Sequence, residues 1–178
     1  MSKLESFIRR MTAQRDYLNH AAELIKDIPG VVFELGLGNG RTYDHLCQIL
    51  PNRDIYVFDR RVASFPSCTP PPDHMFVGEI LHTLKKAEKS FVQKVALVHI
   101  DLGTSDPSKK NYMDLIDSIS DSLESVLLPG AVVVSNIRFN GECFHAIPET
   151  SGVKEGRYFL YGFLGSPSNF PGLVKRAR

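Results

Sequence analysis

The sequence contains no stretch of apolar residues long enough to cross a membrane, which needs about 18 to 20 of them in a row. Its first residues, from Met1 to Glu5, also lack the apolar core of a secretory signal. Only three cysteines occur, scattered and without a Cys-x-x-Cys pair: Cys47, Cys68 and Cys143. This set argues against a disulfide framework and against a zinc site. We therefore expect a cytoplasmic protein with no membrane association and no bound metal.

The sequence also lacks an excess of charge of either sign. It has 21 Lys and Arg against 20 Asp and Glu, a formal net charge of +1 at pH 7. No overall field therefore attracts nucleic acid, and the basic end from Lys175 to Arg178 is too short to change this expectation. The sequence has 178 residues, 43% of them hydrophobic, and no internal repeat. We therefore expect a single domain over residues 1–178. A homo-oligomer is left open.

Short apolar runs alternate with helical patterns along most of the chain. A first helix is predicted over residues 2–28, because Ser2 and Glu5 form a capping box and Pro29-Gly30 ends the pattern. The remaining predicted elements are helices over 41–50, 80–91 and 112–126 and strands over 31–35, 55–59, 75–77, 95–100, 131–134 and 157–163. Nearly continuous apolar strands between helices indicate a mostly parallel sheet with helices on both faces. The predicted fold is therefore an α/β, Rossmann-like, three-layer αβα sandwich.

The most informative stretch is the glycine-spaced turn that follows the first strand. It reads Glu-x-Gly-x-Gly-x-Gly, from Glu34 to Gly40. A strand, a glycine turn and a helix together bring backbone close to a nucleotide-like ligand and point a helix N-terminus at it. A side chain at Gly38 would stand between the backbone and that ligand. The dinucleotide fingerprint would need a third glycine at position 41, which is Arg41, so a nicotinamide-dependent oxidoreductase is the less favoured alternative.

Acidic residues follow the other predicted strands. Asp59 ends the second strand about 20 residues after the glycine turn, the spacing of a carboxylate that binds ribose hydroxyls. A capping or surface role is its structural alternative. Glu79 follows the third strand, where a negative charge also suits the first turn of a helix. Asp101 ends the fourth strand, and since ligands bind at the carboxyl ends of parallel strands, these side chains are expected at one edge of the sheet.

In this order, the landmarks resemble the motifs of the class I S-adenosylmethionine-dependent methyltransferases. The turn from Glu34 to Gly40 looks like the first motif, and Gly78-Glu79-Ile80 is similar to the Gly-Asp-hydrophobic motif, with Glu79 in place of the usual Asp. The stretch Leu128-Pro129-Gly130-Ala131 resembles the L-x-P-G-G signature, with Ala131 in place of the second glycine. The resemblance spans roughly residues 30 to 137.

The resemblance implies a strand order of 3-2-1-4-5 followed by one or two C-terminal strands, of which only 157–163 is clear in the sequence. It also implies S-adenosyl-L-methionine as cofactor and transfer of its methyl group to a nucleophile. The cofactor-binding residues that it implies are Glu34, Gly36, Gly38, Gly40, Asp59, Arg60, Gly78, Glu79, Ile80, Asp101, Leu102 and Tyr17. Asp101 is also the candidate catalytic residue, since it could hold the cofactor's ammonium group or take a proton from the acceptor.

The resemblance also bears on the acceptor. Family members that methylate amino groups carry an Asn/Asp-Pro-Pro-Tyr/Phe motif after the fourth strand, whereas this chain has Asp101-Leu102-Gly103-Thr104. Metal-dependent members have an Asp-Asn pair after the fifth strand, whereas this chain has Ser135-Asn136 and would lose one hard oxygen ligand. No insertion is large enough for a separate substrate domain. We therefore expect a small-molecule acceptor, with O-methylation slightly favoured.

Several candidate residues have a plainer structural interpretation. His99, inside an apolar strand, is expected to be a core histidine with satisfied hydrogen bonds. Arg9, Arg10, Arg15 and His20 on the first helix could close over a cofactor, but a solvated helix face is the favoured interpretation. The acceptor pocket is expected from this helix and from residues 60–74, 102–110 and 138–156. A non-catalytic S-adenosylmethionine-binding module stays open as an alternative function, because it would carry the same motifs.

Overall fold

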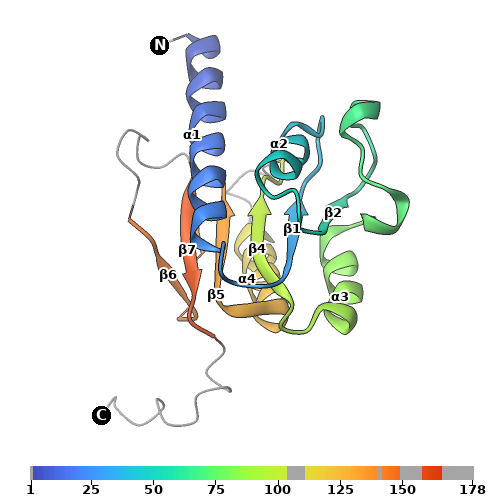
Figure 1. Ribbon diagram of the computed structural model, residues 1–178, viewed down its shortest axis with the longest axis vertical. Helices are drawn as coiled ribbons and strands as arrows, with labels where there is room; N and C mark the ends of the chain where they lie inside the picture. Colours follow the sequence, from blue (N-terminus) through green and yellow to red (C-terminus); the bar gives the residue numbers. More distant parts are fainter. Residues whose placement is uncertain (1, 104–110, 140–141, 149–157, 166–178) are drawn as a thin grey trace.

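The computed structural model describes residues 2–103, 111–139, 142–148 and 158–165 (Figure 1). In chain order the elements are α1 (Lys3–Leu24), β1 (Val31–Leu35), α2 (Arg41–Ile49), β2 (Ile55–Asp59), the short 3-10 helices η1 (Pro66–Cys68) and η2 (Pro72–His74), β3 (Met75–Val77), α3 (Ile80–Phe91), β4 (Val95–Ile100), α4 (Asn111–Val126), β5 (Leu127–Ser135), β6 (Phe144–Ala146) and β7 (Phe159–Phe163).

The strands form one sheet in the order β3-β2-β1-β4-β5-β7-β6. The first five pair in parallel, and β7 runs antiparallel to both β5 and β6. The predicted αβα fold and the order 3-2-1-4-5 are confirmed. Both C-terminal strands are present, although β6 has only three residues and therefore shows no period in the sequence.

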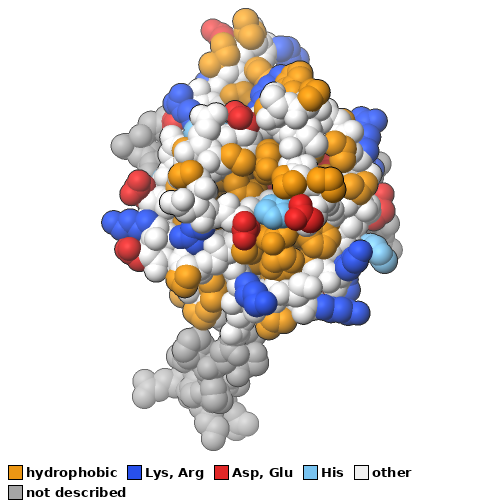
Figure 2. Space-filling model, turned by 45° about the vertical axis from the view of Figure 1, so that its right-hand side comes forward, with side chains coloured by type: hydrophobic (Ala, Val, Ile, Leu, Met, Phe, Trp, Pro, Cys, Tyr) orange, Lys and Arg blue, Asp and Glu red, His pale blue; other side chains and the backbone are white. Residues whose placement is uncertain are grey.

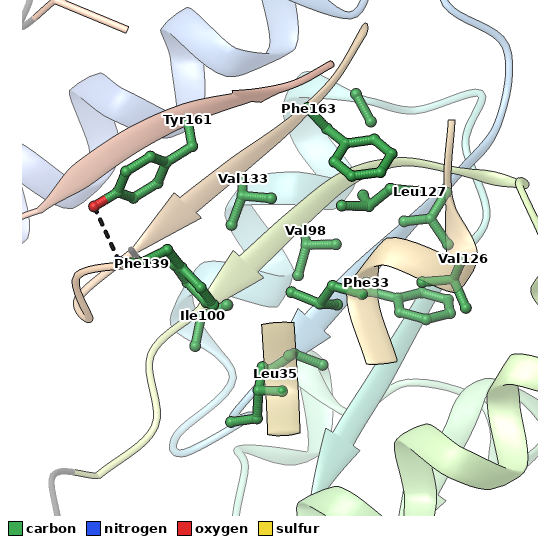
Figure 3. Packing of buried hydrophobic residues seen from close by; sticks show 14 of the residues in the cluster. Phe33, Leu35, Val98, Ile100, Val126, Leu127, Val133, Phe139, Tyr161 and Phe163 are labelled. Carbon is green, nitrogen blue, oxygen red and sulfur yellow. Dashed lines mark hydrogen bonds between the residues drawn. The ribbon is translucent and has the colours of Figure 1, made fainter. Parts of the chain in front are cut away.

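The helices cover the sheet in two layers, α1 and α2 on one face and α3 and α4 on the other (Figure 1). Because successive strand residues point to opposite faces, Val32 packs beneath α1 and α2 while Phe33 packs beneath α3 and α4. Figure 3 shows the second of these cores, where side chains of β1, β4 and β5 meet those of α4 and β7. The hydroxyl of Tyr161 there accepts a hydrogen bond from the backbone N–H of Phe139 at 3.2 Å.

Two element boundaries differ from the prediction by more than two residues. Helix α1 ends at Leu24, before residue 28, because the Arg53 guanidinium donates hydrogen bonds to the carbonyls of Ile25, Ile28 and Gly30 at 2.8, 2.6 and 2.9 Å. Those carbonyls are thus held outside a helix. Strand β5 begins at Leu127, ahead of the predicted residue 131, and a register shift against β4 between Val95 and Leu97 accompanies the early start.

Among the residues that the structure describes, no helix combines the length and the apolar character that crossing a bilayer requires.

Phe33 lies at the centre of the core beneath α3 and α4, with ring centroids 4.8 Å from Phe58 and 5.2 Å from Phe91. Because Phe33 is fully buried, Phe33→Ala should lower the free energy of unfolding by about 3–5 kcal/mol. Denaturant unfolding measures this. The matched variant is Phe65→Ala, whose side chain is 48% exposed and should change stability by no more than about 0.5 kcal/mol. Equal losses in the two variants would contradict this account of the core.

Candidate cofactor and acceptor site

The candidate site residues gather at the carboxyl edge of the sheet. The glycine turn follows β1, Asp59 ends β2, and Asp101 and Asn136 follow β4 and β5. Strand β1 lies between β2 and β4, so the strand order reverses its direction at β1. Such a switch point is where open α/β sheets bind ligands. The N-terminal half of α1 stands beyond this edge (Figure 1).

The three glycines of the turn serve different purposes. A side-chain carbon at Gly36 would lie 2.5 Å from the Asp101 carbonyl oxygen, and one at Gly40 would lie 2.5 Å from that of Cys68. The lack of a side chain at these two glycines therefore lets the turn pack against the backbone of Asp101 and of Cys68. Gly38 has a φ of +52°, and a side-chain carbon there would meet nothing within 4 Å. Its open side is the place in the turn where a ligand can approach the backbone.

Asp59 stabilises this turn by hydrogen bonds to its backbone. Its Oδ2 accepts hydrogen bonds from the backbone N–H groups of Leu37 at 2.8 Å and Gly38 at 3.2 Å, and its Oδ1 accepts one from Arg61 at 3.2 Å. Asp59 therefore has the capping role that is the structural alternative to ribose binding. A carboxylate offers about four lone-pair positions, so Asp59 retains capacity for a ribose hydroxyl. Arg60, beside it, is exposed.

The residues after β3 continue the same edge. The backbone N–H of Gly78 donates to the carbonyl of Asp59 at 2.9 Å, which joins the two strand ends. Glu79 is the N-cap residue of α3, is exposed, and makes no side-chain cap hydrogen bond. Ile80 begins α3 and is half-buried.

A buried ion pair lies under the space between α1 and α2. Glu34 of β1 and His99 of β4 are register partners, both fully buried, with Oε2 and Nδ1 2.6 Å apart. The Thr42 hydroxyl donates to Glu34 Oε1, and the amide nitrogen of Gln14 lies 3.3 Å from His99 Nε2. The expectation of a core histidine is confirmed, and its Nδ1 is paired with Glu34. Glu34 is enclosed, so it shapes the site through Thr42 and His99.

Asp101 is the centre of a polar cluster that joins α1 to the sheet edge. One guanidinium nitrogen of Arg10 donates to both carboxylate oxygens, at 3.1 and 2.8 Å. Gln14 donates to Oδ2 and Asn136 to Oδ1, each at 3.0 Å. Gln14 also donates to the hydroxyl of Tyr158 at 2.6 Å, and Asn136 to the carbonyl of Leu102 at 3.1 Å.

This cluster corrects one sequence interpretation and adds residues that the sequence analysis missed. Arg10 does not belong to a merely solvated face, because it forms an ion pair with Asp101. Gln14 was missed, although it lies one helical turn after Arg10, and a glutamine on an apolar face was the available signal. Tyr158 carried no signal, because only the fold brings this residue, which directly precedes β7, close to His99 of β4 and Gln14 of α1.

A hollow of about 360 Å³ lies between α1 and α2, next to the glycine turn. Three apolar and five polar or basic residues line it: Phe7, Met11, Leu18, Gln14, Arg15, Arg41, Thr42 and His45. Gln14 and Thr42 connect this hollow to the Asp101 cluster and to the buried ion pair. Tyr17 does not line it, since its side chain is fully buried in the core beneath α1. Of the expected acceptor-pocket segments, residues 104–110, 140–141 and 149–156 lie outside the described part of the chain.

Comparisons with known proteins identify the family of the chain. A family model described as S-adenosyl-L-methionine methyltransferase matches residues 1–163. An S-adenosyl-L-methionine methyl transferase from Silicibacter pomeroyi DSS-3 is 40% identical, with a TM-score of 0.83 over 92% of this chain and 99% of that one. Human methyltransferase-like protein 13, in complex with SAH, is 14% identical, with a TM-score of 0.54 over 89% of this chain and 82% of that one, and shows the fold alone. No curated protein matches the sequence.

The Glu34–His99 pair predicts a pH dependence of stability. Burial lowers the pKa of His99, but the attraction and hydrogen bond of Glu34 raise it, and the net pKa is above the ordinary value. The resulting stabilisation is complete below the pKa of an unfolded histidine, about 6.5, and is lost as the pH rises through the raised value. The stability advantage of the wild type over His99→Gln should therefore shrink as the pH rises above about 6.5, measured by urea unfolding.

The matched variant is His82→Gln, at an exposed position of α3. Its difference from the wild type should stay the same across that pH range. A constant difference for His99→Gln as well would mean that the buried pair does not hold a protonated histidine.

Proposed function

The chain belongs to the family of S-adenosyl-L-methionine methyltransferases, and from this premise we propose that it methylates an oxygen atom of a small-molecule acceptor. The cofactor, when bound, supplies a methyl group that its sulfonium already activates. The protein's task is then to hold the acceptor atom in line with that group and to exclude competing water.

The observation that carries the assignment of residues is the open side of the glycine turn at Gly38. It faces the same edge as Asp59, Gly78 and Asp101, of which Asp59 is expected to bind the ribose and Asp101 the ammonium group of the cofactor. The hollow between α1 and α2 adjoins this turn through Arg41 and Thr42. We assign the methionine end to this region, with Leu102 beside it.

Three residues receive narrower roles than the sequence suggests. Glu34 acts indirectly, because its carboxylate is used by Thr42 and His99. Tyr17 supports α1 from within the core. We assign Asp101 to cofactor binding and not to proton transfer, since an arginine ion pair and two amide donors already contact its oxygens.

The acceptor class rests on the size and charge of the protein. The described helices and strands are all used in building the sandwich, and none forms a separate substrate domain. Figure 2 shows one face on which basic and acidic side chains are interspersed and hydrophobic side chains gather around the middle, with no basic stripe for a polyanion. Oxygen is favoured over an amino group because the chain has Asp101-Leu102-Gly103 after β4, where family members that methylate amino groups carry an Asn/Asp-Pro-Pro-Tyr/Phe motif.

Gly38→Ala tests the cofactor site. The added carbon enters the open space above the turn, so binding of S-adenosylhomocysteine by calorimetry should weaken about tenfold or more. The matched control is Gly130→Ala, which has a φ of +84° and lies in β5 near its opposite end. Each variant should lose about 1–2 kcal/mol of stability from a left-handed alanine, but only the first should lose affinity. Unchanged binding by Gly38→Ala would place the cofactor elsewhere.

The acceptor class is tested by incubating the protein with tritium-labelled S-adenosylmethionine and a cell extract separated into small molecules, RNA and protein. Label should enter the small-molecule fraction as a methyl ether or ester, and heat-inactivated protein should transfer none. Label that enters only RNA or protein would overturn the small-molecule proposal, and label recovered as a methylamine would overturn the preference for oxygen.

A further inference from the structure

The carboxylate of Asp101 has no acceptor position left for a ligand. It offers about four lone-pair positions, and four donor contacts fill them: Arg10 to Oδ1 and Oδ2, Asn136 to Oδ1 and Gln14 to Oδ2. A cationic group of a ligand can therefore bind Asp101 only if one of these donors leaves.

The surroundings of the three donors decide which one leaves. Gln14 is 3% exposed and also holds the Tyr158 hydroxyl. Asn136 is fixed by a second bond to the Leu102 carbonyl, and its backbone N–H donates to Ile100 at 3.0 Å. Arg10 also interacts with the Tyr158 hydroxyl, but its side chain is 44% exposed and comes from the part of α1 that stands beyond the sheet edge (Figure 1). Arg10 is thus the donor that can turn away, because solvent can rehydrate its guanidinium.

We propose that the amino-acid end of the cofactor enters the Arg10–Asp101 ion pair, its ammonium group taking the place of Arg10 at Asp101 while Arg10 turns to its carboxylate. The amino-acid end carries an ammonium group and a carboxylate. Binding therefore replaces the single Arg10–Asp101 ion pair with two ion pairs between the protein and the ligand. Arg10 is then a cofactor-binding residue that ties α1 to the sheet edge before binding and to the cofactor afterwards. This inference rests on the proposed function.

The exchange makes each charge of the ligand depend on the other. A ligand with only the ammonium group must expel Arg10 and leaves its charge without a partner. A ligand with only the carboxylate must draw Arg10 from Asp101, whose charge then loses its partner. Removal of one member of a close charge pair leaves the other uncompensated, which is why the two half-ligands should respond in opposite directions to the same substitution.

The experiment measures, by calorimetry, the binding of three ligands to the wild type, Arg10→Gln and Asp101→Asn. The ligands are S-adenosylhomocysteine, the aminopropyl thioether of adenosine, which lacks the carboxylate, and the carboxypropyl thioether, which lacks the ammonium group. Arg10→Gln should weaken S-adenosylhomocysteine about tenfold and strengthen the aminopropyl compound, because its competitor at Asp101 is gone. Asp101→Asn should weaken S-adenosylhomocysteine and strengthen the carboxypropyl compound.

Lys3→Gln removes the same charge from the exposed start of α1 and should leave all three affinities unchanged. Thermal unfolding checks each fold, and Arg10→Lys, which keeps the charge, should recover most of the affinity for S-adenosylhomocysteine. If Arg10→Gln changes all three affinities by one common factor, or none of them, Arg10 is a structural tie and the inference is wrong. If S-adenosylhomocysteine does not bind the wild type at all, the cofactor assignment itself fails, and this inference fails with it.

Discussion

The close contact of the glycine turn with the end of β4 is the constraint on which the site depends. The Asp101 N–H donates to the Leu35 carbonyl at 3.0 Å, and the Gly36 N–H donates to Phe58 at 2.8 Å, so the ends of β1, β2 and β4 are joined. There is no room for a side chain at Gly36, where it would meet the Asp101 carbonyl oxygen. With any larger residue, the turn and Asp101 would be pushed apart, and the one edge that collects the ligand-binding groups would be lost.

A line of polar groups crosses the molecule behind this edge. It begins at Thr42 of α2, passes through the enclosed Glu34–His99 pair, and reaches Asp101 and Tyr158 through Gln14. Buried charges are tolerated only when partners satisfy them, and removal of one partner of such a pair costs about 3–5 kcal/mol. The line therefore sets how α1 and α2 sit on the sheet, and with them the width of the hollow between the two helices.

The position of α1 connects packing to function. Its C-terminal half is core, with Tyr17, Leu18 and Ala21 fully buried against the sheet. Its N-terminal half stands beyond the sheet edge and carries Arg10 to Asp101. One helix thus anchors itself through apolar contacts and presents a cation at the edge of the sheet where the candidate site lies.

The sequence by itself determined the αβα sandwich and the residues at the carboxyl ends of its strands, because apolar period and glycine spacing are local properties. The order of the first five strands followed from the resemblance to the methyltransferase family. The cofactor followed from the same resemblance, which rests on several motifs in order between residues 30 and 137. Only the tertiary structure decided that Arg10 pairs with Asp101, 91 positions away, that Gln14 and Tyr158 join them, and that Tyr17 is buried. Those contacts come from three elements meeting at one edge, and no local pattern reports which side chains of distant elements will touch.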